Sequence, residues 1–492
     1  MEEAKLKEET AEMMEGQADH EEEELAPERI MSKKYPLSGM DAVFAVIFFA
    51  AAWLYWDLIL FHRLIPESAA TEGPAGLFWF SLFYTGAVLG YLAMKKKKPA
   101  AESWFWLAVL IAQSLSLVIF GDHILMGALQ VLAIHGVGIY WTVSASGRLL
   151  ENRTSHWVLF DVLNAGFIIP WGNFLRLPAV WCAGVKAGAG RIRGKKEFPL
   201  KKAAAVCGGI LAALACLCVV IPLLSKADSS FKTVISGMSG WLTNGWSHFW
   251  STVFSGTALM QLVLALFTGM FLYGLVYGCV SGRRAENMTQ KSLTEIRDQF
   301  RFAPAISVIL VLAVLTAVYI VFLLLQAGYM FGAFFGNLPE GFSYAEYART
   351  GFFELCQTVL VNGAVLLAIN LAAKKGVCEG KAFQAAAALV CAATLLLIVM
   401  AASKMGLYIT VYGLTVKRVL VSVFLLWLAI VFISALLLCF RRIPLVRIAA
   451  FSGAVLFTLL CILPVEKGIQ EYNSAGNVFF PVQPCLFKEC VI

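Results

Sequence analysis

Apolar runs of about 20 residues recur along this chain between residues 41 and 464. A run of that length crosses a hydrocarbon core of ~30 Å as an α-helix. A membrane β-barrel shows instead segments of ~10 residues that alternate apolar and polar side chains, and no such alternation appears in the sequence. Only helices and closed barrels satisfy their backbone polar groups in lipid. The pattern therefore predicts an all-α polytopic transmembrane helical bundle, in agreement with a composition that is 60% hydrophobic and 14% charged.

Turns and charges divide the apolar sequence into about eleven predicted spans. They cover residues 41–61, 74–94, 103–121, 122–144, 203–224, 256–280, 303–326, 351–373, 382–402, 416–440 and 446–464. Lysine and arginine are concentrated in every second connection. Because short cytoplasmic loops carry the basic excess, we expect a cytoplasmic amino terminus, an outer carboxyl terminus and a location in the cell (cytoplasmic) membrane. The connection between the ninth and tenth spans departs from this rule, since Lys404, Lys417 and Arg418 lie on its predicted outer side.

The net charge of +7 is explained by this topology and requires no nucleic acid as a partner. The expected partner is the lipid bilayer, and the sequence does not identify protein partners. One basic run contains Lys95, Lys96, Lys97 and Lys98. It can mark the cytoplasmic end of the second span, or it can hold anionic lipid.

Changes in composition divide the chain into five predicted regions. Residues 1–38 are rich in glutamate and are expected to form a disordered cytoplasmic tail. Residues 39–147 form a four-helix membrane part, 148–202 a cytoplasmic interfacial segment and basic linker, 203–464 a seven-helix membrane part, and 465–492 a short outer tail. Within the third region, Pro170 and Pro178 interrupt the aromatic stretch 155–182. This interruption predicts an interfacial helix or a re-entrant pair rather than one continuous helix.

The twelve cysteines and six histidines show no spacing typical of a zinc site, a redox couple or a metalloprotease. We therefore predict no catalytic residues, no cofactor and no metal, and an enzyme is the least favoured class. Cys485 and Cys490 lie in the predicted outer tail, where an oxidising environment permits a disulfide. The sequence leaves open whether they are bridged.

The strongest candidate for a polar site is the charged entry to the eighth span. Glu346, Glu354 and Gln357 follow helical steps on one face, and Arg349 lies three residues beyond Glu346. A carboxyl group placed inside a membrane is usually functional, or is paired with a neighbour. Glu354 is therefore either an ionisable site, as a proton relay requires, or a structural clamp that accepts hydrogen bonds.

A second polar stretch follows about 50 residues later. Tyr408 and Tyr412 are four residues apart, Thr415 is a candidate helix N-cap, and Arg418 lies at the same predicted depth as Glu346. We expect Arg418 to pair with Glu346 or Glu354. The predicted polar site therefore consists of Glu346, Arg349, Glu354, Gln357, Tyr408, Tyr412 and Arg418.

These stretches resemble a bacterial family of multi-pass membrane proteins, the uncharacterised domain of unknown function 4173 (4153-like) family. The resemblance rests on YAEYAR at 344–349, GFFEL at 351–355, YGLT at 412–415 with Arg418, DVLNAGFIIPWGNF at 161–174 and IQEYN at 469–473. It implies a membrane location and a shared site at Glu346, Arg349, Glu354, Tyr412 and Arg418. It implies no catalytic activity, because none is established for the family.

Three classes of function remain. A transport-like or accessory role ranks first, because amides inside the spans could line a polar path, although such amides also serve as contacts between helices. A sensor or assembly protein is the alternative. A lipid-modifying membrane enzyme ranks last, since only the Glu346 and Glu354 group could supply its chemistry.

Overall fold

The computed structural model describes residues 39–61, 76–121, 127–183, 256–283, 290–334 and 352–475. Within these ranges every regular element is a helix, and eleven helical segments are long and apolar enough to cross a membrane. The predicted all-α polytopic bundle is therefore confirmed for the described part of the chain. The predicted tail at 1–38 and the predicted span at 203–224 lie outside the described residues.

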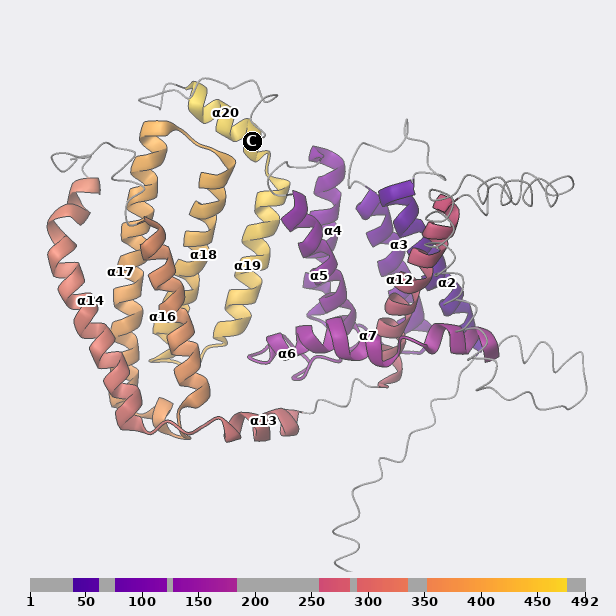
Figure 1. The fold of residues 1–492 in the computed structure, drawn as a ribbon, viewed down its shortest axis with the longest axis horizontal. Helices are drawn as coiled ribbons and strands as arrows, with labels where there is room; N and C mark the ends of the chain where they lie inside the picture. The colour runs from indigo at the N-terminus through magenta and orange to yellow at the C-terminus, as the bar shows by residue number, and fades with distance from the viewer. Residues whose placement is uncertain are drawn as a thin grey trace, which may run out of the picture. The chain divides into compact units, whose positions relative to one another are not determined.

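The first group of helices comes mainly from the amino-terminal part (Figure 1). It contains α2 (Gly39–Trp56), the π-helical turn η1 (Asp57–Phe61), α3 (Gly76–Met94), α4 (Ser103–Phe120), α5 (Gly127–Ala145) and α12 (Gly256–Ser281). α4 packs between α3 and α5, and α12 packs against α5 and η1. Although α12 falls in the predicted region 203–464, it belongs in space to the first group, so chain order and packing divide the helices differently.

The second group surrounds α17. It contains α13 (Gln290–Gln299), α14 (Ala305–Phe334), α16 (Phe352–Ala372), α17 (Lys381–Tyr412), α18 (Val416–Leu438), α19 (Leu445–Ile462) and α20 (Val465–Ser474). α17 packs against α14, α16 and α18, around a core that includes Val359, Leu397 and Leu428. The opposite face of α14 exposes Ile306, Leu310 and other large apolar residues, as a helix in contact with the lipid bilayer does.

Ten of the eleven predicted spans correspond to described helices. The ninth is longer than predicted, because α17 continues through Lys404 to Tyr412 and is ended by Gly413, whose φ is 78°. The structure adds one candidate span, Val158–Ala183, where the sequence predicts an interfacial segment. This segment is not continuous: α6 (Val158–Leu163), the π-helical η2 (Asn164–Ile168) and α7 (Ile169–Gly172) precede a turn and a further helical stretch to residue 183.

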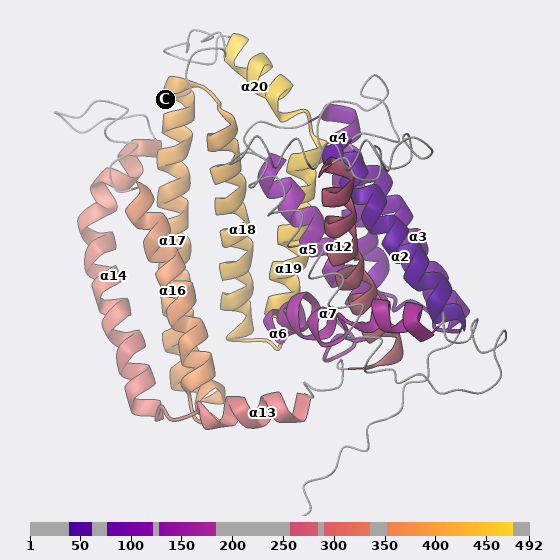
Figure 2. The ribbon, with the colours of Figure 1, turned by 45° about the vertical axis from the view of Figure 1, so that its right-hand side comes forward.

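α6 and α7 lie across one end of the helices of the first group rather than alongside them, and α13 lies across the same end (Figure 2). The interfacial location of this segment stays a prediction. We call this end of the molecule the basic end; it is defined by Lys95, Lys97, Arg148, Arg176 and Arg447. The positive-inside rule predicts that the basic end faces the cytoplasm.

Candidate functional site

The predicted polar site is only partly described. Glu346 and Arg349 lie outside the described residues, as do Cys485 and Cys490. Glu354 and Gln357 lie in the first two turns of α16, Tyr408 and Tyr412 in the last two turns of α17, and Arg418 in the first turn of α18.

Arg418 joins α17 to α18. Its guanidinium donates to the carbonyl oxygen of Tyr412 at 2.9 Å and to that of Gly413, and it lies 4.2 Å from the centroid of the Tyr408 ring. The side chain of Thr415 accepts a hydrogen bond from the backbone N–H of Arg418, so the predicted N-cap is confirmed. A cation that binds the last carbonyls of a helix stabilises its negative end. The structure therefore brings Tyr408, Tyr412 and Arg418 together.

Glu354 is not part of this cluster. Its side chain is exposed on α16, whose buried face is formed by Phe352, Leu355 and Val359. It interacts electrostatically with Lys404 of α17, and none of the ion pairs among the described residues joins it to Arg418. Gln357 is exposed as well. The sequence suggested a buried carboxyl group, but the helical phase of α16 turns Glu354 away from the core.

The turn between α17 and α18 is held by α20. Asn473 accepts a hydrogen bond from the backbone N–H of Leu414 at 2.8 Å and donates one to the Leu414 carbonyl at 3.0 Å. The amide side chain thereby satisfies both backbone groups of a turn residue. This contact gives the IQEYN sequence at 469–473 a structural role.

At the basic end, the first buried carboxylate is Asp41 at the start of α2. It is 1% exposed, and its Oδ1 accepts hydrogen bonds from the hydroxyl of Tyr91 at 2.6 Å and from Lys95 Nζ at 2.7 Å. Tyr273 of α12 donates to the backbone carbonyl of Asp41 at 3.2 Å. Asp41 therefore holds α2, α3 and α12 together.

Two further cations of the basic end cap α12. Lys97 Nζ donates to the carbonyl oxygen of Val280 at 2.6 Å, and Arg148 Nε donates to that of Cys279 at 3.0 Å. The last carbonyls of a helix have no partner inside it, so these cations satisfy groups that would otherwise be costly to bury. Within the predicted lipid-binding run, Lys95 and Lys97 thus have protein partners, while Lys96 and Lys98 are exposed.

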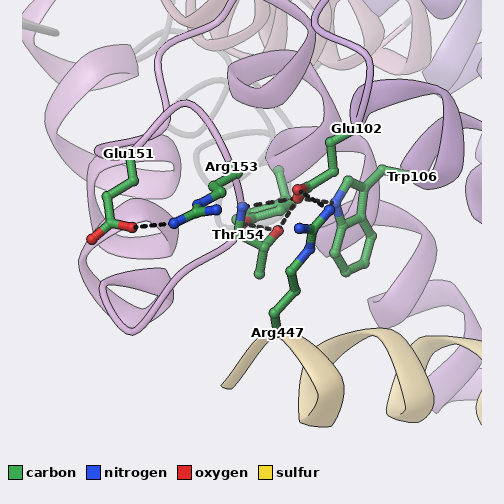
Figure 3. Close-up of polar contacts among 7 residues, drawn as sticks. Glu102, Trp106, Glu151, Arg153, Thr154 and Arg447 are labelled. Carbon is green, nitrogen blue, oxygen red and sulfur yellow. Dashed lines mark hydrogen bonds and ion pairs between the residues drawn. The ribbon is translucent and has the colours of Figure 1, made fainter. Parts of the chain in front are cut away.

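Another carboxylate with a nearly buried side chain is that of Glu102, immediately before α4 (Figure 3). Its side chain is 6% exposed. Glu102 Oε1 accepts hydrogen bonds from the backbone N–H of Thr154 at 2.9 Å, from the Thr154 hydroxyl and from Trp106 Nε1 at 3.4 Å. The other carboxylate oxygen lies 3.1 Å from a terminal guanidinium nitrogen of Arg447, on α19. One carboxylate therefore joins α4, the loop before α6 and α19.

Above this ion pair, α4 and α19 share an aromatic and a polar contact. The rings of Phe105 and Phe451 stack with centroids 4.2 Å apart, and Gln113 Nε2 donates to the hydroxyl of Thr458 at 3.0 Å. We call this contact, from Glu102 and Arg447 to Gln113 and Thr458, the α4–α19 seam. α19 packs on its other side against α18, so the seam joins the two groups of helices.

A polar cluster around Gln113 and Gln130, which we call the glutamine cluster, extends from the seam into the first group. Gln130 of α5 donates to the backbone carbonyl of Gln113 at 2.8 Å and to the hydroxyl of Ser116 at 2.6 Å. Gln113 and Gln130 are 1% and 0% exposed, and the side-chain carbonyl oxygen of each lacks a hydrogen-bond donor. Buried polar atoms are nearly always hydrogen-bonded, so two unsatisfied oxygens in one network indicate a place for a ligand or water.

The sequence did not single out Glu102, Arg447 or the two glutamines. An acid at the start of a span on the basic side was a usable signal for Glu102, but Arg447 lies 345 residues away along the chain and only the fold brings them together. Among the described residues, no group of three or more His, Cys, Asp or Glu side chains could hold a metal ion.

Comparison with known proteins assigns a family. A model of the family described as Domain of unknown function (DUF4153) matches residues 107–477, about three quarters of the chain. The chain belongs to this family. The family prediction is thus confirmed, with 4153 in place of 4173 as its number. No curated protein and no solved structure matches the chain, so this DUF4153 member is a multi-pass membrane protein whose activity must be argued from its own residues.

Proposed function

We propose that this DUF4153 protein has a transport-like role in the cell membrane, with its amino terminus in the cytoplasm, and that it binds a small cation at Gln113 and Gln130. The observation that carries the proposal is the pair of buried glutamine oxygens without donors. Amide oxygens are ligands for hard cations, and they also accept hydrogen bonds from an ammonium ion.

The depth of the cluster fits this role. Gln113 is ten residues into α4, so it lies about 15 Å along the helix from the basic end. Transporters commonly bind their substrates near the middle of the bilayer, at the interface between two groups of helices. The glutamine cluster lies beside the α4–α19 seam, which is such an interface.

The ion pair of the seam supplies a candidate gate. Glu102 and Arg447 join the two groups at the basic end, about three turns from Gln113 and Thr458. Opening this pair would separate the ends of α4 and α19 while the contact between Gln113 and Thr458 remained as a pivot. Rocking of one group of helices against another is a recurrent mode of alternating access.

Cation binding can be tested by thermal unfolding of the detergent-purified protein, followed by tryptophan fluorescence. A ligand that binds only the folded state raises the unfolding temperature. We expect one of Na⁺, K⁺ or NH₄⁺ to raise it relative to choline, and Gln113→Leu and Gln130→Leu to abolish that effect. Thr358→Val is the control, since the Thr358 hydroxyl bonds only within α16 and lies away from the seam.

Two outcomes would redirect the proposal. Stabilisation by a cation without cation flux in proteoliposomes would favour a membrane sensor, which is the alternative function. No stabilisation by any of these cations would remove the proposed binding site, and the glutamines would then be contacts between helices.

A further inference from the structure

An open pocket of about 430 Å³ lies at the basic end, between the turn after α7 and the end of α12. Its lining includes Trp171, Asn173, Leu175, Arg176 and Arg283. It is separate from the glutamine cluster and uses none of the residues of the α4–α19 seam.

Two glycines of α12 let α7 pack closely against this helix beside the pocket. Gly274 and Gly278 are four residues apart and so share one face of the helix. A Cβ atom at Gly278 would lie 2.4 Å from Asn173 Nδ2, and one at Gly274 would lie 2.7 Å from the Pro170 carbonyl oxygen. The backbone of α7 therefore contacts α12 directly, which only glycine permits at these two positions.

Asn173 holds the two chain segments beside the pocket together. It ends α7, and its side-chain Nδ2 donates to the carbonyl oxygens of Ile169 at 2.9 Å and Arg283 at 3.0 Å. The second bond holds Arg283, two residues after the end of α12, against the turn that precedes Arg176. Two arginines from chain segments more than 100 residues apart thereby line one pocket.

The polar atoms of the pocket are not all satisfied by the protein. Asn173 is 1% exposed and its Oδ1 has no hydrogen-bond donor, and Arg176 Nε is buried without an acceptor. The guanidinium of Arg176 lies 5.4 Å from the centroid of the Tyr277 ring, which fixes its position. Two residues that line the pocket, Asn173 and Arg176, therefore each have one polar atom without a partner in the protein.

The rim of the pocket is apolar. Trp171 is 50% exposed and Leu175 is 71% exposed. Tryptophan is enriched at the boundary between headgroups and acyl chains. An apolar rim beside two arginines fits a ligand that has both a phosphate and a hydrocarbon chain.

We infer that this pocket binds a phospholipid whose headgroup carries a hydroxyl group beyond the phosphate, as a glycerol headgroup does. The phosphate binds the guanidinium groups of Arg176 and Arg283, because a planar guanidinium matches two phosphate oxygens. The hydroxyl donates to Asn173 Oδ1. The acyl chains lie along Trp171 and Leu175.

The test is binding of spin-labelled lipid to the protein in phosphatidylcholine vesicles, measured by electron paramagnetic resonance. We expect labelled phosphatidylglycerol to bind more tightly than labelled phosphatidylcholine. Arg176→Gln should weaken the phosphatidylglycerol interaction about tenfold, the size expected for loss of one charge-assisted bond. Arg283→Gln is the second variant, in case Arg176→Gln fails to fold.

The control changes the exposed Lys96 and Lys98 to glutamine at the same end of the molecule. If this double variant loses as much phosphatidylglycerol binding as the arginine variants, the attraction is a property of the whole basic end and the pocket is not the site. A further experiment adds inorganic phosphate or glycerol phosphate as a competitor of the labelled lipid. Full displacement of the labelled lipid by either at equal concentration would mean that the pocket takes a soluble phosphate compound, and would overturn the lipid assignment.

Discussion

Gln113 of α4 donates a hydrogen bond to Thr458 of α19 across 3.0 Å, on the same two helices that the ion pair between Glu102 and Arg447 joins. On each helix the two residues are eleven positions apart, about three turns. α4 and α19 therefore run parallel and in register along the seam. The seam is a specific interface with one polar contact at each level, and each contact can be tested separately.

Arg447→Gln should destabilise the protein by about 1–3 kcal/mol, because it leaves a nearly buried carboxylate with its remaining donors but without its counter-charge. The matched control is Arg153→Gln. The ion pair of Arg153 with Glu151 is 3.7 Å long and its arginine is 63% exposed, so this change should cost about 0–1 kcal/mol. Denaturant unfolding in detergent, followed by tryptophan fluorescence, measures both. Equal effects of the two variants would show that the seam contributes no more than a surface pair.

Gly278→Ala should destabilise the packing of α7 on α12 by about 1–3 kcal/mol, since the new Cβ would meet Asn173 Nδ2 at 2.4 Å and Ile169 Cγ2 at 2.5 Å. Gly86→Ala in α3 is the control, because no atom lies within 4 Å of its added Cβ. That change should be neutral or stabilising by up to about 1 kcal/mol, as alanine favours the helix. The same unfolding experiment distinguishes them, and a neutral Gly278→Ala would contradict the close approach.

Asn473→Ala should release the turn between α17 and α18, since it removes both hydrogen bonds to Leu414. Each such bond contributes about 1 kcal/mol. Amide hydrogen exchange at Leu414 should therefore become about tenfold faster or more. Gln470→Ala, an exposed change on the same helix α20, should leave it unaltered. Unchanged exchange in Asn473→Ala would mean that α20 does not hold the turn.

The contact between α13 and the residues after α16 should weaken in acid. A hydrogen bond from Lys375 at 2.7 Å lowers the pKa of Asp298 below its ordinary value of 3.8. Since the folded pKa is the lower one, the contribution of Asp298 to stability is present above pH 3.8 and is lost as the pH falls through the folded value. Hydrogen exchange in α13 between pH 5 and pH 3 should show this loss in the wild type. It should show the same loss in the control variant Glu295→Gln, which changes another acidic residue of α13. Asp298→Asn should show no such step; a step of unchanged size would assign the pH dependence to another group.

The spans could be predicted because each carries its own signal, a run of apolar residues bounded by charge or turns. The end of α17 was missed because Lys404 resembles a boundary, whereas the helix continues to Gly413. In the polar site, the grouping of Tyr408, Tyr412 and Arg418 followed from helical spacing and a turn. The exposed position of Glu354 could not be predicted, because a shift of one residue in helical phase decides whether a side chain faces the core or the outside.

The contacts of the seam could not be predicted for a different reason. Glu102 and Arg447 belong to helices that are far apart in the chain, and neither residue has a local pattern that names its partner. The same is true of Asn173 and Arg283, although the GxxxG spacing of Gly274 and Gly278 does indicate a close helix contact. Long-range polar pairs of this kind follow from the packing of helices rather than from composition.

The most direct test of the transport-like role is cation flux into proteoliposomes, measured with a dye for Na⁺, K⁺ or NH₄⁺ under an imposed gradient. We predict that wild-type protein carries the cation that stabilises it, that Gln113→Leu abolishes this flux, and that Thr358→Val preserves it. Flux through the wild type no faster than through protein-free liposomes, for all three cations, would contradict the account.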